Sequence, residues 1–177
     1  MTTNPTLLRR RPRLQRLGSA ACSALALTAL LVLLAPVAAE GQVDFGVRGG
    51  VYTDDQDPFA GVELLGSFDG TRWYYNPNVE LVFVDNGDLV TANADFHYDL
   101  PADTPFDVWL GAGGAILFRD YDDDRFGRSV DSETDAGLNL LGGLGFNPGG
   151  DVRPYVQGKL LLSDDSQAVL AFGLRFF

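Results

Sequence analysis

The sequence contains very few of the residues that carry thiol or metal chemistry. Among its 177 residues there is one cysteine, Cys22, one methionine, Met1, and one histidine, His97. The cysteine and the methionine both precede position 40, so positions 40–177 can form no disulfide and offer no thiol nucleophile or cysteine ligand. These absences exclude zinc-finger folds and cysteine-based catalysis.

Basic residues are also scarce, and they are unevenly placed. The chain has 13 Lys and Arg against 24 Asp and Glu, a net charge of −11. Five arginines lie in the first 16 positions and no acidic residue precedes Glu40, so positions 40–177 carry 8 basic and 24 acidic residues. Binding to nucleic acid requires clustered Lys and Arg to neutralise phosphates, so we expect no nucleic-acid partner.

The first 39 residues have the layout of a secretory signal peptide. A cationic start is followed by an apolar run over positions 20–35 and then by Pro36-Val37-Ala38-Ala39. The alternative is a permanent membrane anchor, but the run is shorter than the roughly 20 residues that a spanning helix needs. We therefore predict a signal peptide over 1–39, cleaved before Glu40, and a single domain over 40–177.

Helical periodicity is absent from position 42 onward, and alternation of apolar and polar residues replaces it. Seven breaks rich in Gly, Asp, Asn and Pro divide this region into eight segments. The predicted strands are 43–52, 59–68, 73–84, 89–98, 106–118, 135–146, 152–162 and 168–177. Their lengths suit tilted strands that cross a bilayer, and the short connections predict an antiparallel meander. Pro77 lacks the N–H that a ladder bond needs, which is consistent with a third strand that begins only at Asn78.

The two faces of these strands differ sharply in charge. One stripe contains no charged residue, and the other carries five acidic and five basic ones: Asp44, Arg48, Glu63, Glu80, Asp95, Asp107, Arg119, Arg153, Lys159 and Arg175. A neutral mixture suits a closed lumen, where each ion needs a partner. The alternative is a soluble β-sandwich or lipocalin-like barrel with the charged face in water. Glycines on the charged face and aromatic residues near the strand ends favour a transmembrane barrel.

An eight-stranded barrel has an interior just wide enough for side chains to fill it. We therefore predict that interior ion pairs plug the lumen, in two layers. The predicted network is Asp44, Arg48, Glu63, Glu80, Asp95, Arg153, Lys159 and Arg175. Asp107 and Arg119, on the same stripe, are expected to face water at the rims.

Export, eight alternating strands and a last strand that ends in Phe177 together resemble the small outer-membrane β-barrels of Gram-negative bacteria, the OmpA/OmpX-like class. The resemblance implies an all-β, eight-stranded antiparallel up-and-down transmembrane barrel in the cell outer membrane, with both termini in the periplasm. It also implies that Phe177 is a recognition signal for the barrel-assembly machinery. Arg175 departs from the pattern, because an aromatic or aliphatic residue commonly stands two positions before the final Phe. The expected partners are outer-membrane lipids and that machinery, and the expected state is a monomer.

Two groups of residues could carry chemistry, and neither is convincing. His97 lies between Asp95 and Asp99 on one face of a strand, but no serine has an obvious partner position, so we expect a rim histidine and no enzyme. Asp120, Asp122 and Asp124 echo a calcium loop, yet Arg125 replaces the required glycine. We expect no bound metal and no cofactor.

The predicted function is non-enzymatic, either structural or in surface interaction through the 119–133 loop. The first alternative is a carrier or narrow channel for a small hydrophobic molecule. The second is a soluble periplasmic lipid-binding barrel.

Overall fold

The computed structural model describes residues 43–84, 87–101, 105–121 and 132–177, and these form eight β-strands. The strands are β1 (Val43–Tyr52), β2 (Asp57–Ser67), β3 (Trp73–Val84), β4 (Gly87–Asp99), β5 (Phe106–Tyr121), β6 (Ser132–Phe146), β7 (Val152–Leu162) and β8 (Gln167–Phe176). The predicted signal peptide lies outside the described residues. No helix long and apolar enough to cross a membrane occurs in the described part of the chain.

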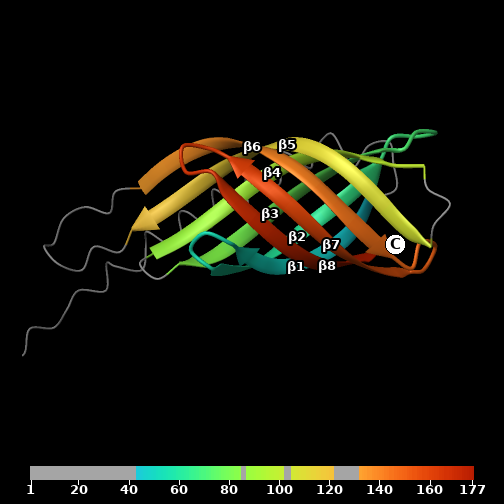
Figure 1. The fold of residues 1–177 in the computed structure, drawn as a ribbon, viewed down its shortest axis with the longest axis horizontal. Helices are drawn as coiled ribbons and strands as arrows, with labels where there is room; N and C mark the ends of the chain where they lie inside the picture. The colour runs from blue at the N-terminus through green and yellow to red at the C-terminus, as the bar shows by residue number, and fades with distance from the viewer. Residues whose placement is uncertain (1–42, 85–86, 102–104, 122–131) are drawn as a thin grey trace, which may run out of the picture.

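The strands form one closed barrel in chain order. Each strand pairs antiparallel with the next, and β8 returns to pair with β1 from Phe45↔Phe176 to Tyr52↔Val169. The strands run diagonally around the barrel (Figure 1). We call the end where β1 begins and β8 finishes the terminus end, and the opposite end the loop end. The eight-stranded up-and-down barrel predicted from the alternation is confirmed.

The barrel is apolar outside and polar inside. Large apolar side chains on the outer wall are well exposed, as with Leu138 at 65 % and Leu110 at 59 %, whereas the inward Glu80 is fully buried. A water-soluble barrel has the opposite arrangement, with its charges in solvent and its apolar side chains in the core. Because the outer wall can be covered only by an apolar medium, the fold is that of a membrane-spanning barrel.

Aromatic side chains form a belt around the terminus end. Ring pairs there include Phe106–Phe146, with centroids 5.6 Å apart, and Trp73–Tyr98 at 5.2 Å. Phe45 stacks on Phe176 at 6.4 Å. Such belts mark the interface between the hydrocarbon and the water in membrane barrels.

Several strands are longer than the sequence indicated. β2 begins at Asp57 and β4 runs to Asp99, while β6 begins at Ser132 and so includes Glu133. Turn-forming residues near the loops predict breaks, but the hairpin ladders continue through them. The balance of five acidic and five basic residues therefore does not hold for the complete strands.

The predicted span 73–84 of the third strand is confirmed, and the alternative start at Asn78 is wrong, because β3 runs from Trp73 through Pro77. Its ladder with β4 is continuous there, but its ladder with β2 is interrupted between Glu63↔Asn78 and Gly66↔Tyr75. Asn76 Nδ2 donates to the Leu64 carbonyl at 2.7 Å. Since Leu64 faces Pro77 in this register, the asparagine side chain supplies the donor that proline lacks.

Candidate functional site in the barrel lumen

The lumen is filled by three layers of different chemistry. The layer at the loop end is apolar, and we call it the apolar layer. It consists of Tyr52, Phe59, Val82, Leu89, Ala115, Leu117, Leu161, Val169 and Ala171. Each of these side chains is at most 6 % exposed, so the layer is packed like the core of a soluble protein.

Glu80 organises the polar middle of the lumen. Its carboxylate accepts two hydrogen bonds from Lys159 Nζ, at 2.9 and 3.0 Å, and one from the Tyr52 hydroxyl at 2.6 Å. Thr91 Oγ1 donates at 3.2 Å. Because Tyr52 also belongs to the apolar layer, this bond joins the two layers.

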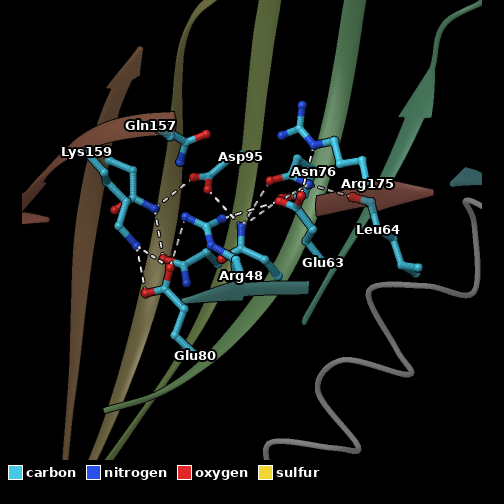
Figure 2. Close-up of polar contacts among 12 residues, drawn as sticks. Arg48, Glu63, Leu64, Asn76, Glu80, Asp95, Gln157, Lys159 and Arg175 are labelled. Atoms are coloured by element: carbon cyan, nitrogen blue, oxygen red, sulfur yellow. Dashed lines mark hydrogen bonds and ion pairs between the residues drawn. The ribbon is translucent and has the colours of Figure 1, made fainter. Parts of the chain in front are cut away.

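Glu63 holds the side of the network nearer the terminus end. Arg175 Nε donates to it at 2.9 Å, and Asn76 Nδ2 donates at 3.2 Å. Arg48 lies between the two carboxylates, with nitrogens 3.5 Å from Glu63 and 3.2 Å from Glu80 (Figure 2). Five charged side chains from β1, β2, β3, β7 and β8 therefore form one connected cluster, which we call the ion-pair cluster.

Asparagine side chains connect Asp95 to this cluster. The Asp95 carboxylate accepts from Asn78 Nδ2 at 3.0 Å and from Asn139 Nδ2 at 2.8 Å. Asn139 also donates to Asn93, and Asn93 donates to Thr91, which bonds Glu80. The amides thus continue the cluster around the lumen as hydrogen-bonded neutral groups, without adding charge.

The charges of the buried middle layer balance. Three cations and three carboxylates are each at most 5 % exposed: Arg48, Lys159 and Arg175 against Glu63, Glu80 and Asp95. An unpaired charge at such depth costs several kcal/mol, so neutrality is what a stable closed lumen requires. The neutrality predicted for the whole inward stripe is thus found in this buried section, among six side chains.

The layer toward the terminus end is aromatic and includes Trp109, Leu141 and Tyr155. The Arg175 guanidinium lies 4.3 Å from the ring centre of Tyr155 and 5.0 Å from that of Trp109. These distances allow cation–π attraction, which complements the bond of Arg175 to Glu63. A small cavity of about 30 Å³ borders this layer, large enough for a water molecule.

Glycines on the neighbouring strands make room for these rings. Gly143 faces Trp109 in the register and Gly173 faces Tyr155. A Cβ atom at either glycine would collide with the facing ring. The glycine-rich inward stripe therefore serves to admit large side chains into a narrow interior.

The eight residues of the predicted network do not all belong to the ion-pair cluster. Asp95 is held by amides, and Arg153 donates to the Gly150 carbonyl at 3.3 Å and covers the Phe177 ring at 3.6 Å. Asp44 lies half-buried near the start of β1. Within the described residues, Arg48, Glu63, Glu80, Lys159 and Arg175 therefore form one connected cluster, which spans both predicted depths. The reason is the length of the arginines, since Arg175 reaches Glu63 from near the end of β8.

The predicted network does not include the asparagines. Asn76 and Asn78 alternate on β3, and Asn93 lies on β4 next to Thr91 and Asp95 at the same two-residue spacing. The inward stripe of the sequence therefore already contains these asparagines, but the predicted network is restricted to ionisable residues. Asparagine at alternate positions of a strand that otherwise faces a lumen indicates neutral links between buried ions.

Of the two groups of residues considered as sites of chemistry, the structure describes the one around His97. His97 is only 2 % exposed, so the expectation of a rim histidine is wrong. Its ring is stacked on Tyr74, with centroids 5.3 Å apart, and its Nε2 lies 3.6 Å from an Asp99 oxygen. Asp122 and Asp124 lie outside the described residues, as does the Asp120 side chain. Within the described residues, no group of three His, Cys, Asp or Glu side chains is placed to hold a metal ion.

Solved structures with the same fold are outer-membrane barrels. The N-terminal β-barrel domain of Pseudomonas aeruginosa OprF is 15 % identical, covers 77 % of this chain and 98 % of its own, and has a TM-score of 0.58. Neisserial surface protein A is 14 % identical, with coverages of 77 % and 94 % and a TM-score of 0.57. Ail, the attachment invasion locus protein of Yersinia pestis, in complex with the heparin analogue sucrose octasulfate, is 12 % identical, with coverages of 77 % and 98 % and a TM-score of 0.55. Comparison with protein-family models and with curated protein sequences gave no match.

Proposed function

We propose that this chain is a non-enzymatic, non-conducting β-barrel of the outer membrane, with a structural or surface-interaction role. The observation that supports the proposal is the set of buried side chains in the lumen, which form the apolar layer, the ion-pair cluster with its amides, and the aromatic layer. With both termini in the periplasm, the terminus end faces inward and the loop end faces the cell exterior. The protein then acts as a monomer embedded in outer-membrane lipid.

Two measurements test the location and the closure. Cell fractionation should place the protein in the outer membrane, and its gel mobility should shift on boiling, as expected for a closed barrel. In planar bilayers the reconstituted protein should give no stepwise conductance. Regular unitary steps from the wild type would instead support the narrow channel. The plug would also be refuted if Glu80→Gln and Glu63→Gln changed neither stability nor conductance.

The loops at the loop end are acidic and so do not favour contact with polyanions. Asp54, Asp55, Asp164 and Asp165 are exposed in the loops at the loop end, and the 119–133 segment is acidic overall. The Ail structure contains a heparin analogue, but an acidic rim repels sulfated chains. We therefore propose a role in envelope integrity or in contact with neutral or basic partners. Retention of the intact barrel on a heparin column at physiological salt would contradict this.

A further inference from the structure

A groove lies in the outer wall of the barrel, on the half nearer the terminus end. It has a volume of about 420 Å³. The outward side chains along it are all apolar: Val47 from β1, Phe146 from β6, Pro154 and Val156 from β7, and Phe172 and Leu174 from β8. The groove is open along the wall, and its apolar lining is of the kind that contacts apolar ligands.

The hollow follows from the register of β1 and β8. Gly49 faces Phe172 across this pair, so the large ring has no side chain beside it on the β1 side. The groove also reaches Arg48 and Tyr155, whose side chains are buried in the lumen, so its floor there is the backbone of the barrel wall. Phe172, which is 54 % exposed, forms a ridge along it.

We infer that this groove binds an acyl chain of a phospholipid from the periplasmic leaflet. The inference rests on the proposed location, since the groove is then open only to hydrocarbon. It starts at Phe146, which belongs to the aromatic belt through its contact with Phe106. A chain that enters from the belt therefore keeps its headgroup at the interface while its methylenes follow the groove toward Gly49.

The surface fits a flexible chain better than a second copy of the barrel. Helices and barrels in lipid gain no hydrophobic advantage from association, so they associate through closely packed small residues or hydrogen bonds. The outward lining contains a single glycine and no hydrogen-bonding side chain, and bulky Phe172 and Phe146 stand along it. An acyl chain needs neither close backbone contact nor hydrogen bonds.

The test is native mass spectrometry of the full barrel in detergent with added dipalmitoyl phosphatidylethanolamine. The wild type should retain one lipid. Gly49→Leu and Val156→Phe each place a larger side chain in the groove, and each should lower the lipid-bound fraction at least fivefold. Gly114→Leu and Val90→Phe make the same changes on the opposite part of the outer wall and should leave retention unchanged. A Cβ at Gly114 meets only the Gly137 carbonyl, at 3.9 Å, so this control is sterically mild.

Equal retention by all five proteins would show lipid bound nonspecifically around the barrel and would overturn the inference. So would a dimer peak in the wild type that Gly49→Leu abolishes, since a second copy would then fill the groove. Each protein is first checked for its gel shift and its outer-membrane location. A wild type that passes both checks but retains no lipid refutes the groove while leaving the proposed function intact, and failure of the location refutes the function itself.

Discussion

At the scale of single residues, Glu80 is a central carboxylate of the ion-pair cluster. It is fully buried and is paired with Lys159 at 2.9 Å and with Arg48 at 3.2 Å. Glu80→Gln keeps the shape but leaves three buried cations with two carboxylates. We expect a loss of about 3–5 kcal/mol in the free energy of unfolding. Urea unfolding in phospholipid vesicles, followed by tryptophan fluorescence, measures it.

Two variants control this experiment. Glu133→Gln removes an exposed carboxylate at the loop end and should change stability by less than about 0.5 kcal/mol. The double variant Glu80→Gln/Lys159→Met restores neutrality in the lumen, so it should be more stable than Glu80→Gln alone. If the double variant were the less stable of the two, charge balance would not be what stabilises the middle layer.

Asn76 provides a second test at this scale, because it replaces a backbone donor. Asn76→Ala leaves the Leu64 carbonyl without its donor opposite Pro77 and should cost about 1–3 kcal/mol. Pro77→Ala returns an N–H to the strand. The cost of Asn76→Ala should therefore be clearly smaller in the Pro77→Ala background, as measured by the same unfolding assay. Equal costs in both backgrounds would assign the effect to the contact of Asn76 with Glu63 instead.

At the scale of strands, the pairing of glycine with an aromatic ring across the ladder determines how the lumen is filled. Gly143→Ala would push a methyl group into the Trp109 ring, which is buried at 2 % exposed. We expect a loss of about 1–3 kcal/mol from overpacking. Gly158→Ala on β7 is the matched control, because a Cβ there meets nothing within 4 Å. Similar losses in both variants would indicate a general strand effect of glycine replacement.

The strands show what the sequence could predict and what it could not. Period-2 alternation located all eight strands, and the charge-free stripe correctly identified the outer wall, because each face has a single environment along its whole length. The ends of the strands were less predictable, since Asp57 and Glu133 are turn-type residues that the hairpins nevertheless pair. The strand through Pro77 could not be predicted with certainty from the sequence for a related reason, because the donor that Asn76 supplies depends on a contact across two strands.

The ion-pair cluster could be predicted only in part, for a reason of geometry. Alternation fixes the face on which Glu63 or Arg175 lies, but not the distance that its side chain spans. Arg175 on β8 reaches Glu63 on β2, two strands away around the barrel, although the two residues are 112 positions apart in the chain. Only the closed register of β1 with β8 brings them together.

At the scale of the whole molecule, replacing Phe177 allows assembly in the cell and stability of the barrel to be tested separately. Phe177 follows β8, its N–H donates to the Asp151 carbonyl at 3.0 Å, and its ring lies under Arg153 at the rim. Such a rim contact contributes only about 0.5–1 kcal/mol.

If Phe177 is the signal for the assembly machinery, Phe177→Ala should lower the outer-membrane level several-fold in cells while the purified barrel refolds in detergent with nearly unchanged stability. Phe45→Ala removes another aromatic of the same belt, one that stacks on Phe176, and should leave the cellular level close to that of the wild type. Equal losses for the two variants would attribute the effect to the belt, and a large loss of stability in Phe177→Ala would attribute it to folding, so that either result would refute the assignment of Phe177 as the signal.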